Sequence, residues 1–270
     1  MKKQLLALAG MALLFVSCSK KDGPSPPPQP EASPFAGLLK GMYNVSDTSR
    51  YEYNDDKTVS KVRNSWKDGA DAGGSIVTMK YANGKISEMW ESTYDKTGVF
   101  GPNRLITAFT YADKNILKIW MWENANNELT DSIRYNAGGK MEKIFRIARI
   151  NALPVIINTD SLVWTGNNIT KLIRESTSAY GGEGFTDMFV HDDKRNVYLD
   201  VQPAMLDGSY ATEPFNANNI VKVTRTKGNK SITNNIQYKY NDKNKVIERI
   251  SAYNFDEGPG IETTVFEYYQ

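Results

Sequence analysis

The fold is decided by a stretch that reads Tyr238-Lys239-Tyr240-Asn241-Asp242-Lys243-Asn244-Lys245-Val246. An alternating run ends in an aromatic residue, a polar turn follows, and a second run opens with a branched apolar residue. Aromatic and β-branched side chains suit a pleated, half-buried surface, and Asn, Asp and Gly supply the positive backbone angles of tight turns. The stretch therefore predicts two antiparallel strands joined as a hairpin.

The same pattern recurs along the chain. Its other copies span 51–59, 79–86, 109–116, 135–141 and 164–169, with a weaker copy at 191–197. Successive aromatic residues are separated by 28, 30, 24 and 29 residues, at Tyr53, Tyr81, Tyr111, Tyr135 and Trp164. Each unit is long enough for one hairpin and one connection, so this internal repetition predicts two strands per unit.

Counting strands places the chain among all-β proteins. The turns together predict about fourteen strands, and the runs 219–225 and 261–269 raise the total to about sixteen. Helical periodicity is absent after Val16, and the repeat is shorter than the roughly forty residues of a propeller blade. We expect a long antiparallel meander of about 14–16 strands, either a curled sheet or a closed barrel.

Apolar residues stand three apart just after most turns, in the pairs Ile86/Met89, Ile116/Ile119, Met141/Ile144 and Ile169/Leu172. After the last turn Arg249 stands three residues beyond Val246, and the apolar spacing returns one step later at Ile247 and Ile250. Residues three apart in a regular strand face opposite sides of a sheet. The spacing indicates either that both faces are covered near the turns or that a bulge shifts the register there.

The N-terminus has the three zones of a secretory signal peptide. Basic Lys2 and Lys3 precede an apolar run over 5–16, and small Ser17 stands at a cleavage point. The apolar run is too short to span a bilayer. We therefore expect residues 1–17 to be removed on export.

The residues around this cleavage point read Phe15-Val16-Ser17-Cys18 and resemble the lipobox of bacterial lipoproteins. Leu is commonest where Phe15 stands, and the other three positions fit. The resemblance implies that the Cys18 thiol carries a diacylglycerol, and acyl chains of this kind anchor a protein to a membrane.

Residues 18–34 form a Pro-rich segment that includes Pro26-Pro27-Pro28. Such a segment favours extended polyproline II and serves as a spacer. We expect a tether over 18–34 that holds an all-β domain, 35–270, away from the outer membrane. Ser19-Lys20-Lys21 precedes a lone Asp22, a pattern that leaves open whether the domain faces the periplasm or the outside.

Charge and residue usage exclude several kinds of site. The formal net charge is +2, and losing Lys2 and Lys3 with the leader brings it to zero. Basic and acidic residues alternate along the chain, so a nucleic-acid surface is not predicted. With Cys18 lipidated, no thiol remains for a disulfide, a metal or catalysis. His191 is the one histidine, which excludes a multi-histidine metal site, and no cofactor is predicted.

The Tyr-x-Tyr-Asn-Asp form of 238–246 resembles the tyrosine-aspartate repeats of secreted bacterial toxins. The lipobox, the repeated hairpins and a long insertion after Asp192-Asp193-Lys194, returning at 218–222, resemble Bacteroidota lipoproteins of the domain-of-unknown-function family numbered 4595. That resemblance covers the mature chain and implies a porin-like fold and an envelope location. The function of that family is unknown, so the resemblance bears on fold and location alone.

A membrane-spanning barrel is disfavoured by the charges on its strands. Lipid-facing positions of such a barrel stay apolar through the membrane band. Here both faces of three predicted strands are charged, at Glu88 and Glu91, at Lys143 and Arg146, and at Glu248 and Arg249. The sequence therefore predicts a tethered domain.

Few residues suggest chemistry. His191 stands where other repeats place Tyr or Trp, so we interpret it as a structural substitute at a hairpin shoulder, although a Ser-His-Asp triad would have to use it. Asp192 and Asp193 fit turn capping, with paired carboxylates of a glycosidase as the alternative. Gly181-Gly182-Glu183-Gly184 lacks the Lys and the helix of a phosphate loop. Asn54-Asp55-Asp56 and Asn241-Asp242 lack calcium-loop spacing.

Two features remain open for binding. Aromatic residues at Trp66, Trp90, Trp120 and Trp122 suit either cross-strand packing or a platform for sugars. The irregular segment 198–218 contains Pro203, Met205, Tyr210, Pro214 and Phe215. A loop of this length is often functional, and plugging one end of a barrel is an equal alternative.

We therefore predict a non-enzymatic binding or structural component of the cell envelope, with an unidentified glycan or protein ligand. An exported glycan-acting hydrolase is the main alternative and requires two carboxylates across a cleft near 198–218. A carrier of small hydrophobic ligands in the barrel mouth is the other, and requires an apolar, unfilled interior.

Overall fold

The computed structural model describes residues 33–69, 71–112, 115–120, 129–176, 182–202, 212–255 and 258–270. These residues belong to one compact unit, Ser33–Gln270. The predicted leader, Cys18 and nearly all of the tether lie outside the described residues, so the lipid anchor and the tether stay predictions.

Strands make up most of the described residues. They are β1 (Leu39–Tyr43), β2 (Asp47–Tyr53), β3 (Val59–Asp68), β4 (Asp71–Ala82), β5 (Lys85–Asp95), β6 (Arg104–Ala112), β7 (Asn115–Trp120), β8 (Leu129–Tyr135), β9 (Met141–Ile150), β10 (Leu153–Thr165), β11 (Asn168–Ser176), β12 (Phe185–Arg195), β13 (Asn218–Lys227), β14 (Lys230–Tyr240), β15 (Val246–Phe255) and β16 (Gly258–Tyr268). This architecture confirms the predicted all-β meander.

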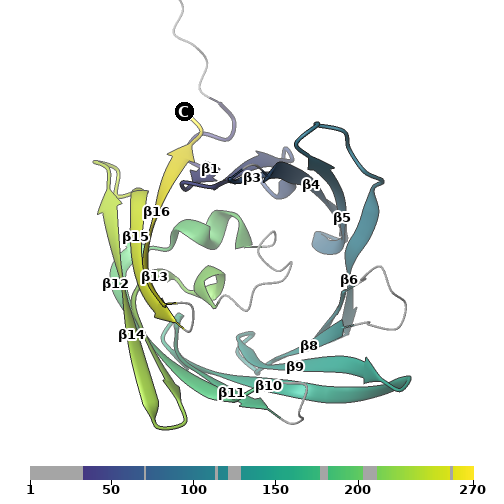
Figure 1. The fold of residues 1–270 in the computed structure, drawn as a ribbon, viewed down its shortest axis with the longest axis vertical. Helices are drawn as coiled ribbons and strands as arrows, with labels where there is room; N and C mark the ends of the chain where they lie inside the picture. The colour runs from purple at the N-terminus through teal and green to yellow at the C-terminus, as the bar shows by residue number, and fades with distance from the viewer. Residues whose placement is uncertain are drawn as a thin grey trace, which may run out of the picture. The chain divides into compact units, whose positions relative to one another are not determined.

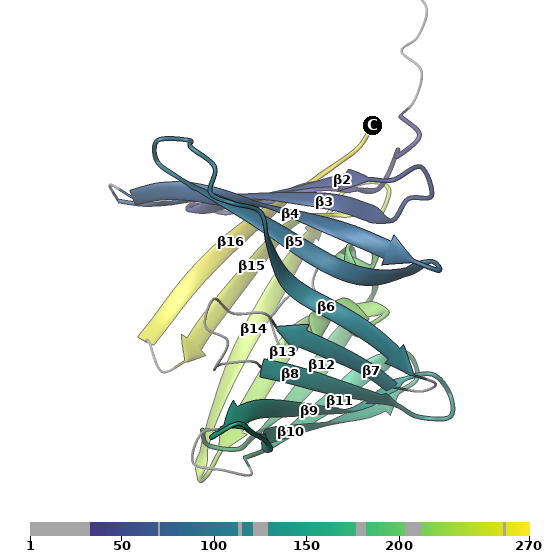
Figure 2. The same ribbon diagram turned by 90° about the vertical axis from the view of Figure 1, so that its right-hand side faces the viewer.

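The meander closes on itself. Each strand pairs antiparallel with the next one in sequence, and β16 pairs with β1 from Leu39 opposite Tyr268 to Tyr43 opposite Val265. Figure 1 looks into the resulting ring of strands. Figure 2, from the side, shows strands at the front and back of the ring running at an angle to one another, as tilted barrel strands do.

The predicted hairpins form where the repeats stand. For example, β2 ends at Tyr53 and β3 begins at Val59, and the turn before Val246 places Asn244 at a φ of 56°. The weak copy at 191–197 differs, because β12 runs on to Arg195 and its partner β13 begins only at Asn218. That copy opens a long connection and not a tight hairpin.

A bulge follows the turn in five of the hairpins, as register shifts there show. Tyr81 lies opposite Ile86, but the next pair inward joins Lys80 to Glu88, so one residue is extra. Ile86 and Met89 are consequently both buried, with 4% and 0% of their surface exposed. The extra residues of the five hairpins are Ser60, Ser87, Glu142, Thr170 and Ile247. The bulge explanation of the three-residue spacing is confirmed for these units.

The last unit corrects one detail of that spacing. Ile247 is the extra residue and is 38% exposed, so the spacing does not continue one step later. Arg249, three residues beyond buried Val246, takes the inward position that apolar residues hold elsewhere. The hairpin at 109–116 has no register shift.

The repeated aromatic residues link neighbouring hairpins. The Tyr81 hydroxyl donates to the Val59 carbonyl at 2.8 Å, and the Tyr111 hydroxyl donates to the Ile86 carbonyl at 2.8 Å. Trp164 makes the equivalent bond through its indole N–H. Burial raises the pKa of Tyr111 to about 12, so its hydroxyl stays a donor at neutral pH. The aromatic spacing in the sequence is thus the spacing of this repeated bond.

The connection between β12 and β13 enters the barrel. Its described part contains two 3₁₀ helices, η1 (Val197–Asp200) and η3 (Glu213–Phe215), which lie inside the ring of strands in Figure 1. From η1 and just after it, Val197, Tyr198 and Val201 join a buried cluster with residues of β1 to β6, β15 and β16. We name residues 196–202 and 212–217 the plug. Of the two alternatives left open for 198–218, these described residues fit the filling of the barrel; residues 203–211 lie outside the described residues.

Candidate functional site

The plug is held by an ion pair with the barrel wall. Arg249 on β15 donates to Glu213 on η3 at 3.0 Å, and their side chains are 16% and 22% exposed. Burial alone would lower the pKa of Arg249, but the Glu213 carboxylate and the adjacent Tyr198 and Tyr238 raise it above its usual value. Arg249 therefore stays charged inside the barrel. The one polar residue in the three-residue pattern is the one that binds the plug.

Buried asparagines fix the backbone of the plug. Asn196 caps η1 by accepting from the Tyr198 N–H, and its amide donates to the carbonyl of Asn216 at 2.9 Å. Asn216 accepts from the Ile169 N–H of β11. Asn219 accepts from the Val197 N–H at 3.1 Å. These asparagines are at most 2% exposed, so each supplies bonds that the irregular backbone lacks.

Asp192 belongs to the same network. It accepts from the Asn219 backbone at 3.1 Å and from the Tyr240 hydroxyl. Asp193, in contrast, has a side chain that is 85% exposed. The two carboxylates thus point into different surroundings and do not form the facing pair of a glycosidase.

His191 lies on β12 opposite buried Ile220. Burial lowers the pKa of His191, with Asn216 and Asp192 acting in the other direction. Its Nε2 atom is buried and has no hydrogen-bond partner in the described part of the chain. The placement fits its interpretation as an aromatic substitute beside the plug.

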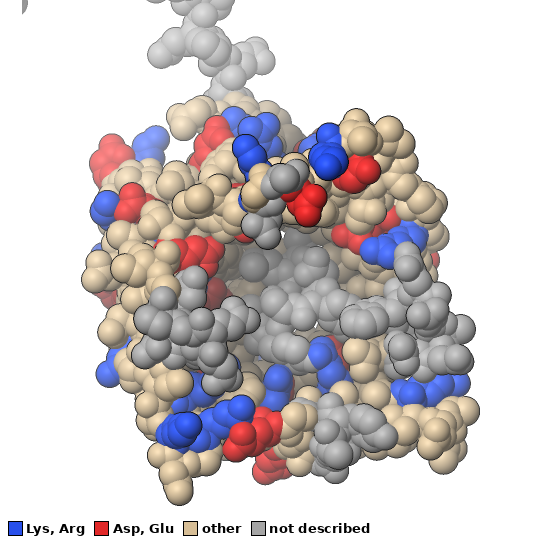
Figure 3. Space-filling view, in the orientation of Figure 1, with Lys and Arg blue, Asp and Glu red and all other residues tan. Residues whose placement is uncertain are grey.

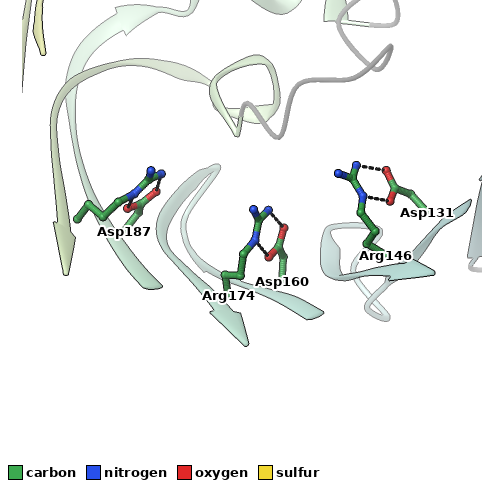
Figure 4. A network of polar contacts seen from close by, with 6 residues as sticks. Asp131, Arg146, Asp160, Arg174 and Asp187 are labelled. Carbon is green, nitrogen blue, oxygen red and sulfur yellow. Dashed lines mark hydrogen bonds and ion pairs between the residues drawn. The ribbon is translucent and has the colours of Figure 1, made fainter. Parts of the chain in front are cut away.

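Three arginine–aspartate pairs line the other part of the interior, and Figure 4 shows them side by side on the strand faces directed into the barrel. We name these six residues the charged wall: Asp131 and Arg146, Asp160 and Arg174, Asp187 and Arg225. Every pair uses both Nε and Nη2 of the arginine, at 2.6–2.9 Å. Bidentate, charge-assisted contacts of this kind are among the strong hydrogen bonds that side chains make.

The carboxylates of the charged wall are less exposed than the guanidinium groups. The Asp187 side chain is 7% exposed and that of Arg225 is 34% exposed. In the middle pair the values are 3% for Asp160 and 12% for Arg174. The interior therefore meets mainly the hydrogen-bond donors of each pair. A carboxylate clamped in this way is not a free acid or base for hydrolysis.

A cavity of about 530 Å³ opens where the charged wall ends. We name it the mouth cavity; its lining includes Glu183, Phe185, Arg225, Lys227, Asn229 and Lys230. The turn 228–229 lies at the end of β13 opposite to Asn219 and the plug. The plug occupies the interior at one end, where a smaller cavity of about 360 Å³ remains beside Asn196, Val197 and Asp200, and the other end keeps the larger mouth cavity.

Trp66 and Trp90 do not share the platform considered for sugars. Trp66 pairs with Gly73 and Trp90 pairs with Thr78. Gly73 and Thr78 are five residues apart in a regular part of β4, so the two indoles lie on opposite faces. The Trp120 side chain and Trp122 lie outside what the structure describes.

The remaining motifs act as turns or strand starts. Asp56 accepts from the Thr58 N–H at 3.0 Å, and Asn241 accepts from the Lys243 N–H at 3.0 Å. Of the glycine-rich run, 182–184 lead directly into strand β12 and not into a helix, and Gly181 lies outside the described residues. No group of three His, Cys, Asp or Glu residues suited to a metal occurs in the described ranges.

Charges of both signs cover the outer wall. Lys80 and Glu88 pair at 2.9 Å on the outside of β4 and β5, and Lys239 pairs with Glu248 at 2.6 Å on β14 and β15. Figure 3 shows Lys and Arg interspersed with Asp and Glu, around a face that is hollowed at its centre. Within the described residues, no helix is long and apolar enough to cross a membrane.

Comparison with known proteins supports the fold. No protein-family model matches the chain, and no curated protein does. A porin-like protein from Bacteroides uniformis ATCC 8492 matches with 10% identity and a TM-score of 0.54, over 86% of this chain and 98% of that one. A porin-like protein from Bacteroides vulgatus ATCC 8482 covers the same shares at 10% identity and a TM-score of 0.43. The first likeness defines the class of fold: this chain has the fold of a porin-like β-barrel.

Within that class, this barrel is distinguished by its plug and its charged wall. Sequence reasoning found the plug segment but not the charged wall. Its signal was present as arginines at mid-strand positions, such as Arg146 and Arg174, with an aspartate on the neighbouring strand. Recognising that these residues face each other requires the exact register of neighbouring strands, and one sequence does not give that register.

Proposed function

We propose that this chain is a lipid-anchored protein of the bacterial cell envelope that binds a ligand through a one-mouthed barrel, and neither catalyses a reaction nor conducts solutes. The observation that carries the proposal is the contrast between the two ends of the interior. The plug is fixed at one end by Arg249 and by buried asparagines, and the other end keeps a donor-rich recess.

The alternatives fit this interior less well. A hydrolase needs two free carboxylates near 198–218, but Glu213 pairs with Arg249 and Asp200 pairs with Arg195 at 2.6 Å. A carrier of hydrophobic ligands needs an apolar space. Here the apolar part of the interior is packed against the plug, and the charged wall lines the rest.

The anchor is proposed from the lipobox at Cys18 and from the outer wall. Charged pairs such as Lys80–Glu88 would oppose burial in lipid, since charges on a lipid-facing barrel surface are destabilising. An acyl anchor would instead hold the domain beside the membrane.

The first test compares tagged wild type, Cys18→Ala and Ser19→Ala by membrane fractionation. We expect the wild type and the Ser19→Ala control in the membrane fraction and Cys18→Ala in the soluble one. Membrane retention of Cys18→Ala would rule out the lipid anchor. Protease added to intact wild-type cells then assigns the side: loss of the tag means outward-facing, and protection means periplasmic.

The second test addresses conduction. Purified full-length protein is added to planar lipid bilayers, and we expect no current steps above the empty bilayer because the plug fills one end of the barrel. Stepwise openings would contradict the proposal and favour a pore.

A further inference from the structure

The mouth cavity carries a cationic excess. Arg225 is neutralised by Asp187, and the Lys227 ammonium lies 3.3 Å from the Glu183 carboxylate. Lys230, at the start of β14, lines the same space, and no acidic partner for it occurs in the described part of the chain. The neighbouring carboxylate of Asp187 is also shielded by Arg225. An entering ligand therefore meets positive charge.

The aromatic side chain of this cavity holds guanidinium groups beside it. Phe185 is contacted from both neighbouring strands, with the guanidinium carbon of Arg225 4.0 Å and that of Arg174 5.0 Å from its ring centroid. Contacts of this type favour cations over an aromatic face. Phe185 thus positions the guanidinium groups, and Ile232 is the one other large apolar residue of the lining.

The barrel architecture limits the kinds of ligand. A peptide that binds by adding a strand needs an unpaired sheet edge, and every described strand has two partners. A lipid or other apolar ligand needs an apolar lining. The cavity instead offers Lys230, the paired side chains of Lys227 and Glu183, and the Asn229 amide. Its volume of about 530 Å³ lies within the range that holds small ligands.

We propose that the mouth cavity binds an acidic saccharide, a hydroxyl-rich ligand that carries a carboxylate. The carboxylate binds Lys230 and Lys227, and the sugar hydroxyls bond with Asn229 and Glu183. This inference rests on the proposed binding function and names the class of ligand for it.

The test is calorimetric titration of the full-length protein with a short oligogalacturonate and with the same oligosaccharide after chemical reduction of its carboxyl groups. The two probes share a sugar backbone and differ in charge. We expect binding of the acidic form that weakens with added salt, because exposed charge pairs are screened. Binding of the reduced form should be weaker by up to about 25-fold, equivalent to the loss of two exposed charge pairs.

Variants locate the site. Lys230→Gln is expected to weaken binding by up to about fivefold, the range of one exposed charge pair, and Lys227→Gln combined with Lys230→Gln by more. Lys222→Gln is the matched control, because Lys222 lies on the same strand as Lys227, five residues away and on the opposite face. Thermal unfolding of each variant checks that folding is unchanged.

Several results would overturn the inference. Equal affinity for the acidic and reduced forms, full affinity in the double lysine variant, or no binding of the acidic form would each do so. Displacement of the oligosaccharide by acetate at equal concentration would show that the site recognises a carboxylate alone and not a saccharide. The fractionation and conductance experiments use no ligand, so they report on the proposed function separately.

Discussion

Two walls of the barrel interior carry polar groups of different kinds. On β8 to β13, the mid-strand positions carry the arginine–aspartate pairs of the charged wall. On β2 to β5, the corresponding inward positions carry a small-residue wall, consisting of Ser49, Asn64, Gly73, Ser75 and Thr93. Ser49 donates to Asn64 at 2.9 Å, and Asn64 donates to Ser75 at 3.4 Å.

The contrast shows how a barrel interior can be polar and still stable. A buried charge is tolerated when an opposite charge and hydrogen bonds compensate it, which the charged wall achieves in pairs across neighbouring strands. The small-residue wall avoids that cost by using neutral groups and by leaving room for a large side chain, since the Trp66 ring lies against Gly73. The first wall depends on pairing and the second on space.

The largest expected effect comes from breaking one pair of the charged wall. Asp160→Ala leaves Arg174 without its bidentate partner, and losing one member of a buried ion pair costs about 3–5 kcal/mol of unfolding free energy. Urea unfolding of the purified protein measures this loss.

The control for that variant lies on the same strand. Ser161→Ala, the adjacent position on β10 and therefore on the other face, is expected to change the unfolding free energy by less than about 0.5 kcal/mol. Asp160→Leu combined with Arg174→Met is expected to recover most of the loss, because well-packed apolar residues can replace a buried pair. A loss below about 1 kcal/mol in Asp160→Ala would mean that the wall does not depend on pairing.

The small-residue wall is tested by adding volume. A Cβ atom on Gly73 would lie 2.7 Å from the backbone oxygen of Tyr94 and 2.8 Å from the Trp66 ring. Gly73→Ala should therefore cost about 1–3 kcal/mol, the usual effect of overpacking. Gly101→Ala is the control, since its added carbon would lie 3.4 Å from the nearest backbone oxygen. Equal urea midpoints for the two variants would contradict the role given to space.

The two walls share the aromatic bond between hairpins, which predicts a smaller effect. Tyr81→Phe removes the hydroxyl that donates to Val59 at 2.8 Å, and one such bond contributes about 0.5–1.5 kcal/mol. Tyr94→Phe removes a contact of 3.5 Å to the Asn64 carbonyl and should cost less. If the two variants lose the same stability, the repeated bond does not explain the regular spacing of the aromatic residues.

Much of this fold could be predicted from the sequence, because turn chemistry and strand alternation are local. The signals for the hairpin before Val246 and for the bulge between Ile86 and Met89 each lie within a few residues of sequence. The closure between β1 and β16 joins Leu39 to Tyr268, and nothing local specifies it. The charged wall was missed for two reasons. Asp187 and Arg225 meet only across the long connection that contains the plug, and the Asp131–Arg146 and Asp160–Arg174 pairs depend on the register set by the bulge after each turn.

The smallest expected effect concerns His191, the one histidine, next to the plug. Burial lowers its pKa in the folded protein below the ordinary 6.5, so below that pH the unfolded chain binds more protons than the folded one. Stability should then fall as the pH decreases from 6.5 through the folded pKa. His191→Gln removes this group. We expect the unfolding free energy of this variant to change less between pH 7.5 and pH 5.5 than that of the wild type, and the difference should not exceed the contribution of one titrating group. Identical pH slopes for the two proteins would show that His191 titrates alike in both states, and would place it in contact with water and not against the plug.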